Sequence, residues 1–138
     1  MADRVMFWLG VEFTHFCIAA KLQNLIDAEF FAIIDITKKP KKFFKTQKIV
    51  NFKKSWYFFD SVKPSKNNVD YDYLERFEKK YDINLWKLAI NERVFYRFYD
   101  FHRFTTHEIC SILEQECKLF EKILDEVEPD FLLTKDTS

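Results

Sequence analysis

The stretch VMFWLGVEFTHFCIAAKLQNLIDAEFFAIIDI, residues 5–36, decides the fold class of this chain. It opens with an uninterrupted apolar run at residues 5–9, which is typical of a strand buried on both faces of a parallel sheet. Gly10 follows, and from Thr14, a candidate N-cap, apolar residues recur at helical spacing. A second apolar run at residues 28–36 predicts another buried strand. Two such strands joined by a helix form a βαβ unit.

The rest of the chain is expected to be mostly helical. Pro40 should interrupt regular structure, and residues 48–52 predict a short third strand. Beyond a loop at residues 63–70, the predicted helices span residues 71–80, 84–99 and 106–127. Thr105 and Glu108 have the spacing of a capping box at the start of the last helix, and residues 130–134 predict a closing strand.

These elements predict one α/β domain, a Rossmann-like parallel sheet flanked by helices. A βαβ unit with a basic-aromatic segment occupies residues 1–62, and a helical segment ending in a strand occupies residues 70–138. The charge changes sign between the halves: residues 1–69 carry 12 Lys and Arg against 6 Asp and Glu, and residues 70–138 carry 10 against 16. Ligand-binding loops of such sheets follow the carboxyl ends of strands, so a chain that stops there is expected to be a truncated or partial domain.

Several classes of protein are excluded by composition. The chain has one Gly, so neither a three-glycine dinucleotide fingerprint nor a phosphate-binding P-loop can be present. Cys17, Cys110 and Cys117 have no metal-binding spacing and are expected to be reduced thiols. No apolar run is long enough to span a bilayer, and no secretory leader is recognisable. We therefore expect a cytoplasmic protein without a metal site.

The turn after the first strand is the first candidate site. In an open parallel sheet this turn, around Gly10, lies at the carboxyl edge beside a helix N-terminus that favours anions. Glu12 or His15 could there act as a catalytic general base. The alternative is that both side chains are ordinary surface residues of the helix.

A basic-aromatic segment is the second candidate site. Its lysines alternate with aromatic residues, a pattern that suits anionic phosphates, lipid interfaces or stacked bases. The candidate acceptor- or phosphate-binding residues are Lys38, Lys39, Lys41, Lys42, Lys45 and Trp56. A solvated lysine loop beside ordinary core aromatics is the alternative. A further basic-aromatic cluster at residues 93–104, which includes His102, is better explained by packing.

Two stretches resemble parts of known glycosyltransferases. Residues 81–93, which include YDINLWKLA and NER, resemble a helix of capsular-polysaccharide and related surface-glycan transferases. Residues 114–132 are similar to the passage of a helix, a Pro-Asp pair and a strand in the N-terminal domains of GT-B glycosyltransferases. The opening βαβ unit fits the same domain.

The resemblance implies an acceptor-binding N-terminal domain of an enzyme of surface or capsular polysaccharide biosynthesis. Some members place a catalytic base in the loop after the first strand, where this chain has Glu12 and His15. A missing C-terminal domain would bind the nucleotide-sugar donor, so the chain alone would hold no cofactor and be inactive. A glycan or lipid-linked acceptor at the inner membrane face would suit the basic-aromatic segment, which could contact the anionic membrane surface peripherally.

Two other functions remain open from the sequence. One is a non-catalytic α/β interaction module whose surplus of Phe covers a protein partner. The other is a nucleic-acid-binding domain that uses the lysines. The second is disfavoured because the net charge is zero and no RNA-binding signature is present.

Overall fold

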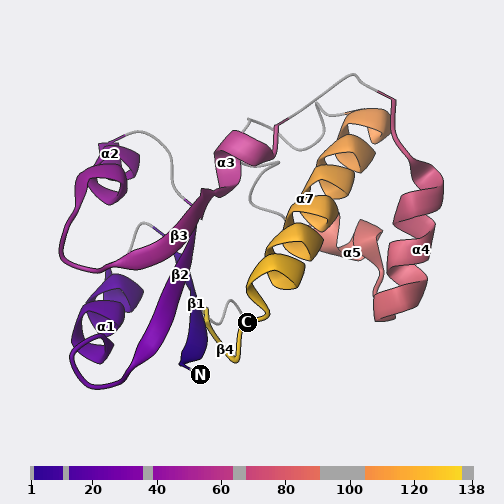
Figure 1. Ribbon diagram of the computed structural model, residues 1–138. Coiled ribbons are helices and arrows are strands. Elements are labelled where there is room, and N and C mark those ends of the chain that lie inside the picture. Colours follow the sequence, from indigo (N-terminus) through magenta and orange to yellow (C-terminus); the bar gives the residue numbers. More distant parts are fainter. Residues whose placement is uncertain (1, 11–12, 36–38, 64–67, 91–104, 135–138) are drawn as a thin grey trace. The chain divides into compact units, whose positions relative to one another are not determined.

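A computed structural model describes residues 2–10, 13–35, 39–63, 68–90 and 105–134 of the chain. The chain divides into two compact units, one of residues 1–59 and 123–138 and the other of residues 60–122. Its elements are, in order, β1 (Asp3–Leu9), α1 (Thr14–Leu22), β2 (Ala28–Ile34), α2 (Lys39–Thr46), β3 (Phe52–Tyr57), α3 (Phe58–Ser61), α4 (Tyr71–Tyr81), α5 (Leu85–Ile90), α7 (Thr106–Val127) and β4 (Phe131–Leu133) (Figure 1).

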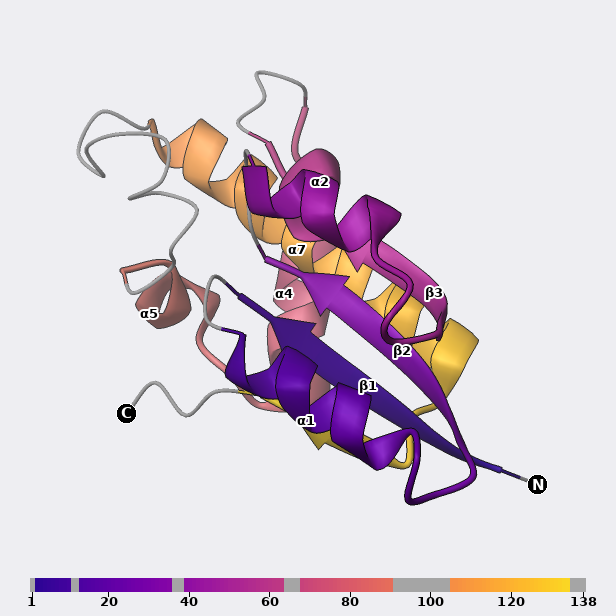
Figure 2. The same cartoon turned by 90° about the vertical axis from the view of Figure 1, so that its left-hand side faces the viewer.

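The first unit is built on a four-stranded, all-parallel sheet of order β3-β2-β1-β4. The predicted α/β class, with a Rossmann-like parallel sheet flanked by helices, is therefore confirmed. Helices α1 and α2 lie on the same side of the sheet (Figures 1 and 2). The crossovers run from β1 towards β3, whereas β4 pairs with the opposite edge of β1, so the strand order reverses at β1.

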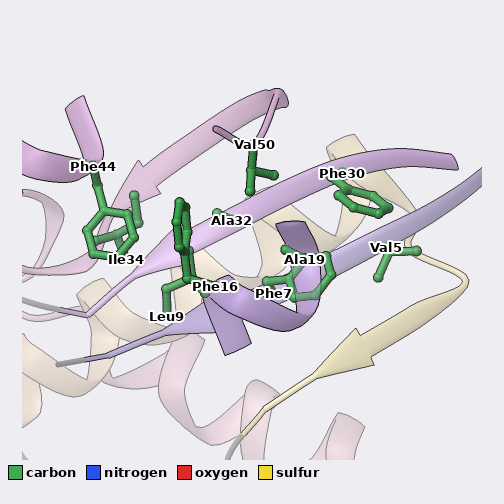
Figure 3. Close-up of a cluster of buried hydrophobic side chains, with 10 residues drawn as sticks. All are labelled: Val5, Phe7, Leu9, Phe16, Ala19, Phe30, Ala32, Ile34, Phe44 and Val50. Carbon is green, nitrogen blue, oxygen red and sulfur yellow. The ribbon is translucent and has the colours of Figure 1, made fainter. Parts of the chain in front are cut away.

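The core of this unit lies between the sheet and its two helices. Figure 3 shows side chains from β1 and β2 meeting Phe16 and Ala19 of α1 and Phe44 of α2. Alternate strand residues point to this face because side chains on a strand alternate between its two sides. The buried cluster consists of Val5, Phe7, Leu9, Phe16, Ala19, Phe30, Ala32, Ile34, Phe44 and Val50.

Arg4 adds three hydrogen bonds to the ladder that pairs β4 with β1. The Arg4 amide donates to the Asp130 carboxylate at 2.8 Å, and the Arg4 carbonyl accepts from the Asp130 amide at 2.8 Å. The Arg4 guanidinium also donates to the carbonyl of Val127, the last residue of α7, at 2.8 Å. These three contacts place a strand of only three residues in register with β1.

The second unit is helical. Asp70 caps α4 by accepting from the Tyr73 amide at 3.0 Å, and Glu114 of α7 accepts from the Asp70 amide at 3.0 Å. The predicted capping box at the start of α7 is present: the Thr105 hydroxyl accepts from the Glu108 amide at 3.1 Å, and the Glu108 carboxylate accepts from the Thr105 amide at 3.3 Å. These contacts explain why α4 and α7 match their sequence predictions closely.

Two sequence predictions were wrong. Residues 39–46, where Pro40 was expected to interrupt regular structure, form α2, because a proline near the start of a helix removes only an amide that has no helical partner anyway. The third strand is β3, which begins at Phe52, whereas the prediction was residues 48–52. Its true start follows a turn in which the Gln47 side chain accepts from the amides of Ile49 and Val50 at 2.8 and 2.9 Å.

The start of α1 also differs in detail. Thr14 is the first helical residue, and Phe13 occupies the N-cap position without a side-chain hydrogen bond. The predicted N-cap at Thr14 is thus one residue late. None of the helices in the described ranges combines the length and the apolar character needed to cross a bilayer.

Candidate functional site

The candidate site is the carboxyl edge of the parallel sheet, where β1, β2 and β3 end. Gly10, Asp35 and Phe58 are the residues directly after these three strands. Helix α1 starts shortly after β1 and brings its own first turn to the same edge. In open parallel sheets ligands bind at this edge, beside the strand at which the order reverses, and here that strand is β1.

His15 lies in the first turn of α1 and is half-buried. Its Nδ1 atom is 3.3 Å from the carbonyl oxygen of Trp8, near the end of β1. A carbonyl oxygen can only accept, so this contact is a hydrogen bond when Nδ1 carries the proton. In the neutral ring Nε2 then has the free lone pair, and the imidazole can accept a proton from a bound group.

Trp8 connects His15 to the end of β2. Its indole Nε1 donates to the carboxylate of Asp35 at 3.3 Å, and the Asp35 amide donates to the carbonyl of Leu9 at 2.7 Å. Asp35 is 4% exposed, and the Trp8 ring packs at a tilt against Phe58 with centroids 5.6 Å apart. The edge therefore carries a proton acceptor on the α1 side of the sheet. The buried carboxylate and the half-buried Trp8 ring lie on the other side, because Phe7 and Leu9 point to α1.

Sequence reasoning missed Asp35. The available signal was an acidic residue directly after an otherwise apolar strand, since AEFFAII is followed at once by Asp35. A buried carboxylate needs hydrogen-bond donors, and the Trp8 indole supplies one. This donor becomes visible only when β1 and β2 are paired.

Gly10 has no steric reason to be glycine in this structure. Its φ lies outside the left-handed region, and an added Cβ would meet nothing within 4 Å. Its role as the backbone turn of the site stays a prediction, because residues 11 and 12 lie outside the described ranges. The second candidate base, Glu12, falls among these residues.

The predicted lysines and Trp56 are not brought together. Lys41 and Lys45 of α2 lie over the ring of Tyr57, 5.5 and 5.2 Å from its centroid. Trp56 is the residue before Tyr57 in β3, so it points to the other face of the sheet, and it is 8% exposed. Lys42 is exposed on α2.

Three other predicted features fall outside what the structure describes. Lys38 and the cluster at residues 93–104 lie in undescribed segments, and for Lys39 only the backbone is described. Among the described residues, no group of three His, Cys, Asp or Glu side chains could hold a metal ion.

Comparisons with protein-family models, curated proteins and solved structures find no match to this chain.

Proposed function

We propose that this chain is the acceptor-binding half of a glycosyltransferase of surface or capsular polysaccharide biosynthesis, with His15 as its general base. The observation that carries the proposal is the contact of His15 Nδ1 with the Trp8 carbonyl at the carboxyl edge of the sheet. It leaves Nε2 as the acceptor atom, at the edge where open parallel sheets bind their ligands.

In the proposed reaction an acceptor hydroxyl attacks the anomeric carbon of a nucleotide sugar. The new bond joins the acceptor oxygen to that carbon, the bond from that carbon to the phosphate oxygen breaks, and the nucleoside diphosphate leaves. The hydroxyl proton passes to Nε2 of His15. A histidine suits this step because a neutral imidazole has a lone pair that can take up the hydroxyl proton.

The surroundings of His15 support acceptor binding. Helix α1 begins at Thr14, and its N-cap residue Phe13 provides no side-chain cap, so the first amides of the helix are available to a negatively charged or hydroxyl group. The half-buried Trp8 ring, supported from behind by the buried Phe58, offers an aromatic surface against which a sugar ring can pack. In this proposal the donor is bound by a further domain, and the protein works at the cytoplasmic face of the inner membrane as a peripheral protein.

The test is sugar transfer by the polypeptide made from the whole reading frame. We expect His15→Ala to lower kcat by about 10²–10⁴-fold, as removal of a general base does. The matched control is His107→Ala on α7, which should transfer sugar at the wild-type rate. Wild-type activity in His15→Ala would eliminate His15 as the base, and loss in Glu12→Ala alone would assign that role to Glu12.

A second candidate function is favoured by the edge strand β4. Phe131 and Leu132 of β4 are 58% and 56% exposed. Because β4 is an edge strand, its exposed apolar side chains and unpaired backbone groups favour pairing with another chain. In this alternative the chain is a non-catalytic module that pairs through β4. Phe131→Lys should then abolish self-association or partner capture in sedimentation experiments, while His15→Ala should have no effect.

A further inference from the structure

Gln23 joins two loops at the amino edge of the sheet, opposite to the candidate site. Its side-chain amide donates to the Ile49 carbonyl at 2.6 Å and accepts from the Asn51 amide at 3.3 Å. One loop connects α1 to β2 and the other connects α2 to β3. We call residues 23–27 and 47–51 the loop pair.

The loop pair exposes three aliphatic side chains. Leu25, Ile26 and Ile49 are 67%, 45% and 57% exposed. Their side chains face solvent even though their backbone amides are hydrogen-bonded. Ile26 and Leu25 donate their amides to the Leu22 carbonyl, and the Ile49 amide donates to Gln47. Single exposed aliphatic residues are common, but three on two joined loops form an apolar projection.

Lysines outnumber acids in this part of the chain, with Lys21 at the end of α1 and Lys48 within the loop pair. Residues 13–27 and 39–51, which form the helical layer, contain six lysines and one acid, Asp27, for a net charge of +5 (6 − 1). The exposed Lys21 and Lys48 have no ion pair within the described part of the chain. By contrast, five lysines elsewhere in the described ranges pair with acids: Lys53, Lys54, Lys79, Lys80 and Lys118.

We propose that the loop pair docks on an anionic lipid bilayer. The aliphatic side chains would enter the boundary between head groups and acyl chains, and the lysines would contact anionic head groups. A bilayer fits better than a protein partner because lysine is depleted in protein–protein interfaces but attracted to anionic membranes.

The inference rests on the peripheral location proposed above, but not on sugar transfer. It also changes which residues contact lipid. The aromatic side chains of the basic-aromatic segment that the structure describes are largely buried, with Phe44, Trp56 and Phe58 at 7%, 8% and 2% exposure. The aliphatic loop residues take the inserting role that the sequence suggested for those aromatics.

Vesicle co-sedimentation of the full chain tests the inference. The experiment compares vesicles of phosphatidylcholine alone with vesicles in which about one third of the lipid is phosphatidylglycerol. The wild type should bind the anionic vesicles and release them at high salt. Lys21→Gln/Lys48→Gln should weaken binding about 25-fold, at about fivefold for each lysine. Leu25→Ser/Ile49→Ser should weaken it about tenfold or more.

Matched controls separate docking from general surface change. Leu124→Ser alters an aliphatic residue that is 49% exposed on α7, and Lys79→Gln removes a lysine of α4. Both should bind as the wild type does, and far-ultraviolet circular dichroism should show that all variants are folded. His15→Ala should also bind normally, so that failure of docking and failure of the catalytic proposal are distinguishable.

Three outcomes would overturn the inference. The first is equal binding to both kinds of vesicle, and the second is equal loss in the control variants. The third is that the wild type binds no vesicles but forms a dimer, and that Leu25→Ser/Ile49→Ser abolishes the dimer. This result would assign the loop pair to contact with a second copy of the chain.

Discussion

Truncation of Phe16 should be among the most damaging changes in the first unit. Phe16 joins α1 to α2 because its ring, 5% exposed, meets Phe43 and Phe44 edge-on with centroids 5.5 Å away in each case. It also contacts Phe52 of β3 at 6.5 Å. Burial of a Phe ring contributes about 2.5 kcal/mol, and lost ring pairs and the cavity add to this. We expect Phe16→Ala to lower the free energy of unfolding by about 4 kcal/mol.

The assay is urea denaturation followed by circular dichroism. Phe13→Ala is the matched control, because Phe13 contacts the same two rings but is 47% exposed. It should cost about 1.5 kcal/mol, roughly in proportion to its smaller buried area. Phe16→Leu keeps much of the volume and should cost about 1.5 kcal/mol, which keeps the comparison measurable if Phe16→Ala does not fold. Equal losses in Phe16→Ala and Phe13→Ala would refute the assignment of Phe16 to the core.

Two substitutions and one labelling experiment test the second unit and the thiols. Glu121→Gln should lower stability by about 1–2 kcal/mol at neutral pH, since the Glu121 carboxylate accepts from the Tyr73 hydroxyl. This hydrogen bond lowers the pKa of Glu121 from its ordinary value of 4.5. The carboxylate therefore stabilises the fold above pH 4.5, and this contribution is lost as the pH falls through the lowered pKa of the folded state. The urea curves of variant and wild type should converge in acid. Thr105→Ala removes the capping hydroxyl of α7 and should cost about 1 kcal/mol in thermal unfolding; no change would contradict the capping role. Burial raises the pKa of Cys117 to about 12, whereas Cys17 is exposed, so a thiol reagent should modify Cys17 first, and faster labelling of Cys117 would contradict its burial.

The βαβ unit and α7 were predictable because local pattern and tertiary structure agree there. A continuous apolar run is the pattern of a strand that is covered on both faces. A long apolar stripe behind a capping box is the pattern of a helix that packs along one side. Helix α2 was missed because Pro40 and the lysines obscure the pair Phe43 and Phe44, which the helix directs towards the core. Strand β3 was misplaced because an edge strand carries exposed lysines instead of an apolar run.

The candidate site was only partly predictable. His15 could be identified because the position of the turn follows from the order of strand and helix. Its partner, the Trp8 carbonyl, and the buried Asp35 depend on strand pairing, which periodicity does not encode. Trp56 was grouped with the lysines because they are close in sequence, but consecutive strand residues face opposite sides of a sheet.

The most direct test of acceptor binding at the carboxyl edge uses the three tryptophan indoles as reporters. Trp8 lies in the candidate site, Trp56 is buried in β3 and Trp86 is exposed on α5. The ¹⁵N-labelled chain would be titrated with short oligosaccharides that carry phosphate or uronic acid. We predict a saturable shift of the Trp8 indole resonance, unchanged Trp56 and Trp86 resonances, and retention of binding in His15→Ala. Shifts confined to Trp86, or an unmoved Trp8 with every oligosaccharide, would contradict the proposed acceptor site.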